Sequence, residues 1–443
     1  GIFVCSSVSG LWKRSHNAKV EKMLEGRIKK HVLNLTDAEI KFIEKQSNIQ
    51  ALRKMFVKEI YDEDLDEKID ENQDIFALQN GVFDSTTTKF RRTNPQDYAM
   101  TNAGWKYDKV LSEKHMDEVK DFFDKILPIK EERIVILYFI ASLLHGYRVD
   151  KAFIVLTDKR RGWNGKTTLI TLLRTLFGDY LESNTKFFCR PQMNNETKHS
   201  HDAGFDPIKG KRVVVADELK KNMLLDDAFI KNIAGGSLYM VGGRKIHSDS
   251  RYKFKWQAGV IMVFNEGDCP KFDPTDSALT SRMIVCPMRS KFTTDTTILA
   301  TEPNSFELDP EIHKKFVDWR SALLDFLIPY CRSDGLTRVN IPDSMKQWKE
   351  EIITDNNEIG EFLNNHTMKT GSPSDFVSLG KLWTLYKALD VGRKITQKEF
   401  NSLTKTHFGN HQFKEQHYYL EMGTRKKIRN VFLNLLFVDP VVE

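Results

Sequence analysis

The sequence lacks the features that would place it across a membrane, outside the cell or around a structural metal. Its longest apolar segment, residues 134–144, contains Tyr138 and Ser142 and is shorter than the roughly 18 residues that a membrane span requires. The chain does not open with a basic leader and a long apolar stretch, so no secretory signal is expected. The five cysteines follow no C-x-x-C or Cys/His metal spacing, which favours reduced, unpaired thiols.

Other absences narrow the range of functions. The sequence has no internal repeat or low-complexity tract, and a net charge of +6 over 443 residues permits nucleic-acid binding without establishing it. The acidic run at 61–74 is not a calcium loop, because Glu67 stands where such a loop needs glycine. The length suffices for about two to four domains. Because the chain opens without methionine, we expect a fragment that lacks an upstream region.

Residues 162–168 read G-W-N-G-K-T-T and connect an apolar, strand-like segment to an apolar, helix-like one. This pattern predicts a phosphate-binding loop, because glycines let backbone N–H groups turn toward an anion at the positive end of a helix. Lys166 is expected to reach the outer phosphates and the Thr167 hydroxyl to bind Mg²⁺. Arg160 replaces a glycine of the full pattern, so an ordinary loop with an exposed lysine stays open as an alternative. The expected nucleotide-binding residues are Gly162, Asn164, Gly165, Lys166, Thr167 and Thr168.

An acid pair follows the next strongly apolar segment, residues 213–216. This run of three valines and an alanine predicts a buried parallel strand. Asp217 is expected to hold Mg²⁺ through its water ligands, and Glu218 to orient and polarise the attacking water. Alternatively, the two acids cap a following helix.

Two further polar residues adjoin predicted strands. Asn265 ends the apolar segment 260–264, and an amide there can donate a hydrogen bond to a γ-phosphate or to the lytic water. Arg282 precedes the apolar residues 283–285 and, in a ring, can reach a neighbouring subunit's γ-phosphate as an arginine finger. A turn residue and a surface charge are the plainer alternatives. The order of loop, acid pair, amide and arginine favours an ATPase that uses ATP and Mg²⁺.

Together these motifs give residues 153–292 a resemblance to the superfamily III helicases of DNA viruses. Within that group, the segment is most similar to the ATPase half of the poxvirus-type primase-helicases of large cytoplasmic DNA viruses and related phages. The match comprises the loop, a G-K-R step before the acid pair, a K-x-x-x-G-G segment with a later arginine, and a sensor element. Outside the loop it rests on Gly210, Lys211, Arg212, Lys231, Gly235, Gly236, Arg244, Asn265, Pro270, Asp276, Ala278 and Arg282.

Two flanking segments resemble the same family more loosely. Residues 76–84 are similar to its upstream N-G hairpin, and Asn80-Gly81 by itself predicts a tight type I′ turn. Residues 382–386 and 395–400 are similar to its C-terminal winged-helix region. The modest basic excess after Gly371 suits a module near DNA, although an ordinary surface looks similar.

The resemblance implies an α/β fold with a P-loop AAA+-type ATPase core. Around this core we expect an N-terminal helical and hairpin domain, a helical collar and a C-terminal winged-helix-like domain. The expected boundaries are 1–112 for the N-terminal domain, 113–150 for the collar, 151–295 for the ATPase, 296–370 for a helical region and 371–443 for the winged-helix-like domain.

Basic residues surround a turn at 242–253, between the acid pair and the Asn265 strand, and predict a β-hairpin there. In superfamily III helicases a hairpin at this place contacts the DNA backbone inside the ring. The resemblance therefore makes Arg244, Lys245, His247 and Lys253 the candidates for phosphate contacts. A solvated basic tip is the alternative.

The function implied is an ATP- and Mg²⁺-dependent DNA helicase that forms a hexamer and translocates on one strand. Its expected partners are single-stranded or forked DNA, further copies of the chain, a primase domain and polymerase-associated replication proteins, with no membrane. If the protein is viral, replication sites in the host cytoplasm are the expected location, and otherwise it is intracellular. Two alternatives stay open: a P-loop ATPase that moves no nucleic acid, such as a remodeller or phosphotransferase, and a DNA-binding replication scaffold with vestigial hydrolysis.

Overall fold

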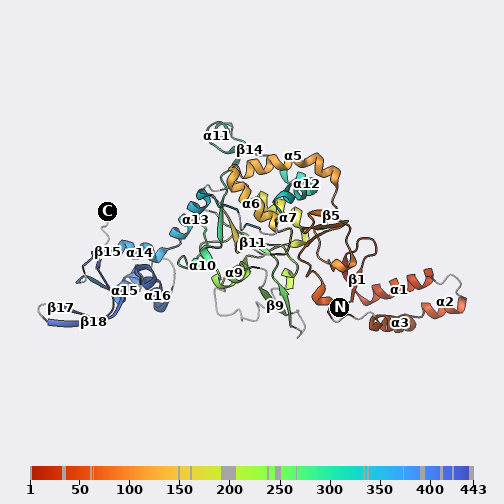
Figure 1. Ribbon diagram of the computed structural model, residues 1–443, viewed down its shortest axis with the longest axis horizontal. Helices are drawn as coiled ribbons and strands as arrows, with labels where there is room; N and C mark the ends of the chain where they lie inside the picture. Colours follow the sequence, from red (N-terminus) through yellow and green to blue (C-terminus); the bar gives the residue numbers. More distant parts are fainter. Residues whose placement is uncertain are drawn as a thin grey trace.

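The structure is a computed structural model with a central body and an extension on each side (Figure 1). The N-terminal helices α1 (Asn17–His31), α2 (Asp37–Glu44) and α3 (Gln46–Glu59) form one extension, and the C-terminal module forms the other. The residues described are 2–31, 36–59, 62, 64–147, 150–159, 162–190, 206–236, 239–244, 251–265, 267–332, 335–336, 339–372, 374–389, 395–409, 413–421 and 424–438.

A five-stranded parallel sheet occupies the centre of the body, in the order β12-β6-β11-β8-β7. Nearly all of its residues are buried, as the apolar runs predict for parallel strands that are covered on both faces. This sheet confirms the expected α/β class and is consistent with a P-loop core. Its strands are β6 (Phe153–Thr157), β7 (Leu181–Ser183), β8 (Val213–Ala216), β11 (Gly259–Val263) and β12 (Met283–Pro287), with helices α7 (Lys166–Phe177), α9 (Asp227–Ile233) and α10 (Ser277–Thr280) between them.

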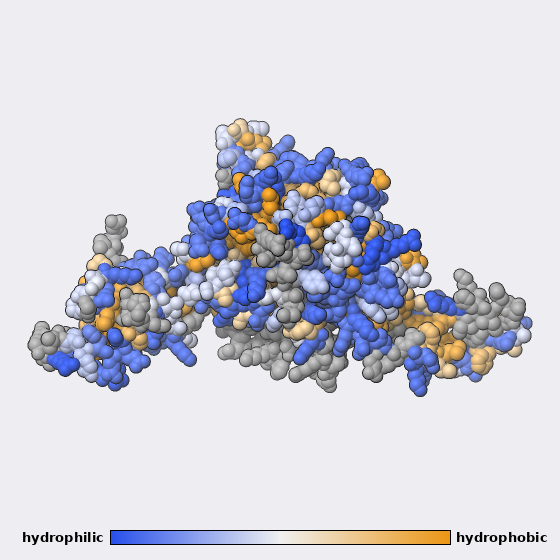
Figure 2. All heavy atoms as spheres, viewed as in Figure 1, coloured by the Kyte–Doolittle hydropathy of each residue, from blue (hydrophilic) through white to orange (hydrophobic). Residues whose placement is uncertain are grey.

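The N-terminal helices carry much of the exposed apolar surface. Met23, Phe42, Met55 and Phe56 are all exposed there, with exposed fractions between 37% and 66%. The hydropathy colouring shows an orange area at this end of the molecule (Figure 2). The hairpin β1 (Ile2–Cys5) and β2 (Trp12–Ser15) precedes these helices, and the short helix α4 (Leu65–Lys68) follows them.

A small antiparallel sheet joins this region to the central body. Its strands are β3 (Ile75–Leu78), β4 (Gly81–Asp84) and β5 (Lys89–Arg91). The ring of Phe76 lies 5.6 Å from that of Phe177, the last residue of α7, and 4.8 Å from that of Tyr180, in the turn that follows α7. Trp105 Nε1 donates to the carbonyl of Leu176 at 2.8 Å. The β3–β5 sheet and the sheet-bearing body thus share one hydrophobic core.

The predicted hairpin at Asn80-Gly81 is present, but its turn lies one residue earlier than expected. Leu78 pairs with Gly81, so the two turn residues are Gln79 and Asn80, and neither has the positive φ of a type I′ turn. The Asn80 side chain instead accepts from the backbone N–H of Tyr107 at 2.9 Å and donates to its carbonyl at 2.8 Å. Gly81 is required for another reason, because a Cβ there would collide with the Phe90 ring.

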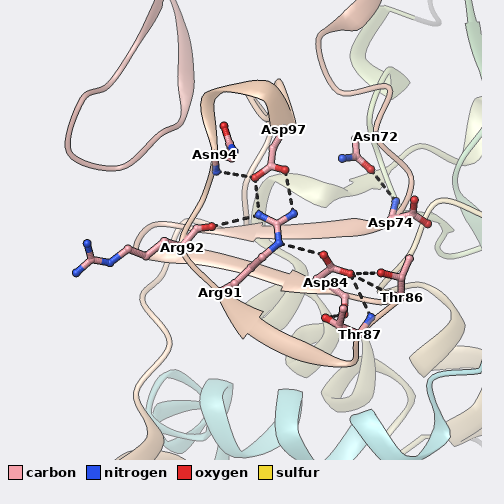
Figure 3. Close-up of polar contacts among 9 residues, drawn as sticks. All are labelled: Asn72, Asp74, Asp84, Thr86, Thr87, Arg91, Arg92, Asn94 and Asp97. Carbon is pink, nitrogen blue, oxygen red and sulfur yellow. Dashed lines mark hydrogen bonds and ion pairs between the residues drawn. The ribbon is translucent and has the colours of Figure 1, made fainter.

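Arg91 organises the polar side of the small sheet (Figure 3). Its guanidinium donates twice to Asp97 at 2.9 Å and once to Asp84 at 3.0 Å, and Asp97 also accepts from Asn94 N at 2.7 Å. Burial works to raise the pKa of Asp84, but hydrogen bonds from Thr86 and Arg91 bring that pKa below its ordinary value. Hydrogen bonds to Asp97 and to Asp84 raise the pKa of Arg91, so its guanidinium stays charged.

Three further helices share the hydrophobic core on the α7 side of the sheet (Figure 1): α5 (Lys109–Ile126), α6 (Lys130–Ser142) and α12 (Ile312–Leu327). Phe122 on α5 lies 5.8 Å from both Phe316 and Trp319 on α12, so segments almost 200 residues apart in sequence meet here. The predicted buried helix near 134–144 corresponds to α6. Among the described helices, none is both long enough and apolar enough to cross a membrane.

The C-terminal module has its own hydrophobic core, which includes Phe362, Leu382, Phe400 and Phe432. Its elements run helix, strand, strand, helix, helix and then three strands, and the long hairpin β17–β18 extends from its far end (Figure 1). They are α14 (Glu358–His366), β15 (Thr367–Lys369), β16 (Phe376–Ser378), α15 (Leu379–Ala388), α16 (Gln397–Phe408), β17 (Phe413–Glu421), β18 (Thr424–Leu433) and β19 (Leu435–Phe437). The elements β13 (Lys291–Thr293), α11 (Thr296–Thr301), β14 (Ser305–Glu307) and α13 (Asp343–Asp355) lie between β12 and this module in the chain.

Candidate nucleotide-binding and catalytic site

The loop between β6 and α7 has the backbone shape of an anion cradle. Gly162, Trp163 and Gly165 have positive φ values of 80°, 58° and 86°, and Lys166 begins the helix directly afterwards. A Cβ on Gly165 would lie 2.8 Å from the Ile126 side chain, so this glycine is required by both conformation and space. Loop N–H groups and the N-terminus of α7 together favour a bound anion. Arg160 lies outside the described residues.

Lys166 is buried, and its ammonium is already paired within the chain. Its Nζ lies 2.5 Å from Oδ2 of Asp158, a carboxylate that is only 2% exposed. The Asn164 side chain donates to the same carboxylate and accepts from the backbone N–H of Lys166 at 3.3 Å. Lys166 therefore sits at the loop as expected, but a phosphate would have to displace Asp158 to reach it.

The acid pair lies at the carboxyl end of β8, where the sequence predicts it. Asp217 is half-buried and its Oδ1 accepts from the backbone N–H of Glu218 at 3.0 Å, while Glu218 is exposed. Glu218 has φ 55°, a left-handed conformation that is uncommon for a residue other than glycine. Such backbone strain often accompanies functional positions.

The sheet register brings Asn265 to the same edge. Leu156 pairs with Val263, and Met262 pairs with Ala216, so the strands that carry the loop, the amide and the acids all end together. Neighbouring strands are about 4.8 Å apart, which puts Asn265 between the loop strand and the acid-pair strand. The strands that carry the candidate groups therefore end at one edge of the sheet, the carboxyl edge, where open α/β folds bind ligands.

Arg282 lies at the opposite edge. Its backbone carbonyl accepts from Phe153 N at 2.9 Å, at the start of β6, which is five residues before Asp158. At about 3.3 Å per residue, this places Arg282 roughly 16 Å from the loop of its own chain. Its Nη1 donates to the carbonyl of Ala278, and its Nε has no hydrogen-bond acceptor. It cannot act on a nucleotide held by its own loop.

The predicted basic hairpin is present as β9 (Met240–Arg244) and β10 (Arg251–Lys255), paired antiparallel. Lys253 is exposed and pairs across the hairpin with Gly242. Arg244 is the last residue of β9. Lys245 and His247 lie outside the described residues.

A cavity of about 570 Å³ adjoins the other side of the loop. Trp163, Gly165 and Thr168 form its floor, and α5 and α12 contribute Phe122 and Trp319 to its walls. A volume of this size and aromatic lining suit a small organic ligand. Composition and motifs do not predict this cavity, because its walls come from helices that meet only in the folded chain.

Two lysines of the sequence motifs, Lys231 and Lys166, form ion pairs that the sequence analysis did not predict. Lys231 is ion-paired with Asp276, which also accepts from the N–H groups of Ala278 and Leu279 and so caps α10. Burial works to raise the pKa of Asp276, but the hydrogen bonds from Lys231 and from the N–H groups of Leu279 and Ala278 bring that pKa below its ordinary value. Asp158 is the other omission; an acid directly after the strand that precedes the loop was the available signal.

Known proteins resemble this chain in sequence and in fold. Residues 3–128 match the family model described as D5 N terminal like. The chain is 25% identical to Putative helicase L207/L206 of Acanthamoeba polyphaga mimivirus over 351 residues, which are 76% of this chain. It is also 25% identical to Putative helicase 121R of Invertebrate iridescent virus 3 over 349 residues, or 74% of this chain. The matched part is 36% of the length of each relative, so the chain spans about a third of them.

A solved structure shares the fold. The apo structure of the NrS-1 C-terminal region superimposes with a TM-score of 0.50 over 96% of this chain and 92% of that one. At 12% sequence identity, this likeness concerns the fold alone. The chain thus carries a D5 N-terminal-like domain and is a distant homologue of viral proteins named as helicases, which confirms the resemblance predicted from the motifs.

Proposed function

We propose that this chain is the motor part of an ATP- and Mg²⁺-dependent DNA helicase. The observation that carries the proposal is the common edge of β6, β11 and β8, where the loop, Asn265 and the acid pair meet. Those groups supply what phosphoanhydride hydrolysis needs: a phosphate cradle, oxygen ligands for a metal, and groups that position a water. The distant homology to proteins named as helicases supports the same assignment.

Each group has a role that its position supports. The N–H groups of the loop and Lys166 bind the phosphates, and the aromatic cavity beside Thr168 receives the nucleoside. The exposed Thr167 hydroxyl and the half-buried Asp217 carboxylate are hard oxygen ligands that fit Mg²⁺, which when bound neutralises charge on the phosphates. Glu218 orients the attacking water, and Asn265 donates to the γ-phosphate or to that water.

The position of Arg282 supports a ring. Because it lies at the far edge of its own sheet, it can contribute only to a nucleotide held by an adjoining copy. In known NTPases such a guanidinium contributes roughly 10³- to 10⁵-fold in rate. A closed ring, most simply a hexamer, gives every site this contribution. The hairpin β9–β10, with Arg244, Lys245, His247 and Lys253, would contact the DNA strand and move with the nucleotide state.

ATP hydrolysis with and without single-stranded DNA tests the proposal. We expect DNA to stimulate turnover, and Lys166→Ala or Glu218→Gln to reduce it by at least about 10²-fold. Arg282→Ala should bind ATP normally without hydrolysing it, and mixing it with Glu218→Gln should restore some active interfaces. No restoration on mixing would contradict action between subunits.

The same measurements separate the alternatives. If the ATP hydrolysis rate of an assembled ring is the same with and without single-stranded DNA, a remodeller that moves no nucleic acid is favoured. A wild-type rate no higher than that of Glu218→Gln would favour a DNA-binding scaffold. An association with a primase region and with polymerase-associated proteins stays part of the proposal, because this chain spans about a third of the length of its relatives.

A further inference from the structure

The segment that follows Asn265, residues 267–273, is bonded to Asn265 and to the region of the acid pair. Asp268 N donates to the Asn265 carbonyl at 2.9 Å, which ties the start of the segment to the candidate amide residue itself. Further along, Lys271 N donates to the Met223 carbonyl and Leu225 N donates to the Lys271 carbonyl, both at 2.8 Å. The backbone of residue 271 is therefore paired, in parallel orientation, with the residues that follow the acid pair.

The other side of the 267–273 segment is bound by Asn356, which lies 84 positions after Phe272 in the sequence. The Asn356 Nδ2 donates to the Pro270 carbonyl at 2.9 Å, and its Oδ1 accepts from Phe272 N at 3.2 Å. In a parallel pairing, the peptide groups on either side of a bonded residue point away from the partner strand. Residue 271 therefore faces the acid-pair region, while residues 270 and 272 face Asn356. The side-chain amide, with one donor and one acceptor in use, takes the place of a further strand.

An ion pair adds to the same contact. Lys271 Nζ lies 3.2 Å from Glu358 Oε1, and the two side chains are only 21% and 23% exposed. Asn356 directly follows α13, and Glu358 is the first residue of α14, with which the C-terminal module begins. The junction between these helices therefore contacts the 267–273 segment through one amide and one carboxylate.

Helix α13 is fixed in turn to the strand that precedes the phosphate-binding loop. Trp348 and Ile352 pack against the hydrophobic core to which β6 contributes Val155. The Trp348 ring centre also lies 5.0 Å from the ammonium of Lys159, two residues after the end of β6. Figure 1 shows α13 between the central body and the C-terminal module. Because α13 packs against the sheet in this way, Asn356 relates the 267–273 segment to the strand that leads into the loop.

A group that acts on a γ-phosphate needs a backbone that is held on both sides of it. Strand β11 ends two residues before Asn265 and fixes the chain on one side. The 267–273 segment fixes it on the other side, and Asn356 bonds that segment to the end of α13. A displacement of about 1 Å can lower the rate of a catalysed reaction about 10²-fold, so small movements of this segment matter for turnover.

We propose that Asn356 is a positioning residue for ATP hydrolysis, which holds the 267–273 segment so that the Asn265 side chain is aligned with the γ-phosphate or the attacking water. This inference rests on the proposed motor function and adds a residue from outside the sequence motifs. Asn356 acts through the segment and not by contact with the nucleotide. Since it lies directly before the C-terminal module, the alignment of Asn265 depends on a junction far from the loop in sequence.

Steady-state ATP hydrolysis by the full chain tests the proposal. Asn356→Ala should lower kcat about 10- to 100-fold and leave KM for ATP within about twofold of wild type, because alignment in the transition state is lost while the phosphate cradle is intact. Asn356→Asp keeps the shape of the side chain but cannot donate to the Pro270 carbonyl, so it should lower kcat similarly. In an Asn265→Ala background, Asn356→Ala should have no further effect on kcat, because the two residues act as a unit.

The next residue in the chain supplies a matched control. Asn357 Oδ1 accepts from Gly360 N at 2.9 Å and so caps α14. Asn357→Ala should therefore lower the resistance to denaturant while kcat stays at the wild-type value. Circular dichroism establishes that each variant is folded, and Asn356→Asp replaces Asn356→Ala if the latter is not.

The outcomes separate this inference from the motor assignment. A wild-type kcat in a folded Asn356 variant would overturn the inference alone, and so would a kcat loss that adds in full to that of Asn265→Ala. An equal loss of kcat in Asn357→Ala would also overturn it, because the junction would then act only through its stability. A wild-type chain that hydrolyses no ATP would refute the motor assignment and this inference together.

Discussion

The ion pair between Lys166 and Asp158 predicts that this pair competes with a nucleotide for Lys166 and so weakens nucleotide binding. Both groups are buried, with Asp158 2% and Lys166 6% exposed, and their charged atoms lie 2.5 Å apart. Close, desolvated charge pairs have coupling energies of roughly 1.5–7 kcal/mol. A nucleotide that takes Lys166 must first break this pair. Asp158→Asn removes the competing charge and keeps the shape of the side chain.

We expect Asp158→Asn to lower the dissociation constant for Mg·ATP by about 10- to 100-fold, since each tenfold step is about 1.4 kcal/mol. The lower half of the coupling range is appropriate, because the variant amide still accepts a hydrogen bond. Without nucleotide, the variant should be less stable by about 1–3 kcal/mol, since the ammonium is left in a buried site without its counter-charge.

Titration with a fluorescent ATP analogue measures the first effect, and denaturant unfolding measures the second. Asp343→Asn is the matched control, because Asp343 pairs with an exposed lysine on α13, away from the loop. In a Lys166→Ala background, Asp158→Asn should have no further effect on affinity. If Asp158→Asn binds nucleotide no more tightly than wild type, while Asp343→Asn behaves like wild type, Asp158 does not compete with nucleotide for Lys166. Asp158 would then stabilise the conformation of the loop instead.

Three further predictions concern the architecture around the site. Gly165→Ala should weaken nucleotide binding at least tenfold, because position 165 has φ 86° and a Cβ there meets Ile126; circular dichroism should show the fold retained. Gly81→Ala should destabilise the protein by about 1–3 kcal/mol in denaturant unfolding through collision with Phe90, and a matched Gly26→Ala change, where nothing lies within 4 Å, should not. Arg91→Met should cost about 1 kcal/mol at pH 7, after allowance for solvent screening. The pKa of Asp84 is lowered by folding, so this contribution is present above about pH 4 and is lost as the pH falls through the folded pKa; an equal difference between Arg91→Met and wild type at pH 2.5 and pH 7 would contradict it.

Local patterns were sufficient to predict the central sheet. The valine run before Asp217 and the apolar run before the loop are strands because such segments are stable only when buried on both faces. The same patterns predicted that Asn265 and the acids would share an edge, and the register places them there. Their chemical roles stay predictions until they are measured.

What could not be predicted depends on partners distant in sequence. The turn at Gln79 and Asn80 is displaced because Tyr107 occupies the asparagine side chain with two hydrogen bonds. The pairing of Lys166 with Asp158 follows from how the loop folds back on its own strand, which no spacing rule encodes. The aromatic cavity exists only because α5 meets α12.

The shared core of the β3–β5 sheet and α7 limits where this chain can be truncated or divided. Phe76 and Trp105 cover the far end of the helix that Lys166 begins, and Ala77 N donates to the Tyr180 hydroxyl at 3.0 Å. A truncation at residue 112 would expose that end of α7 to water and leave an apolar surface that favours aggregation. A chimera that carries the central sheet and α7 must therefore also include the β3–β5 sheet.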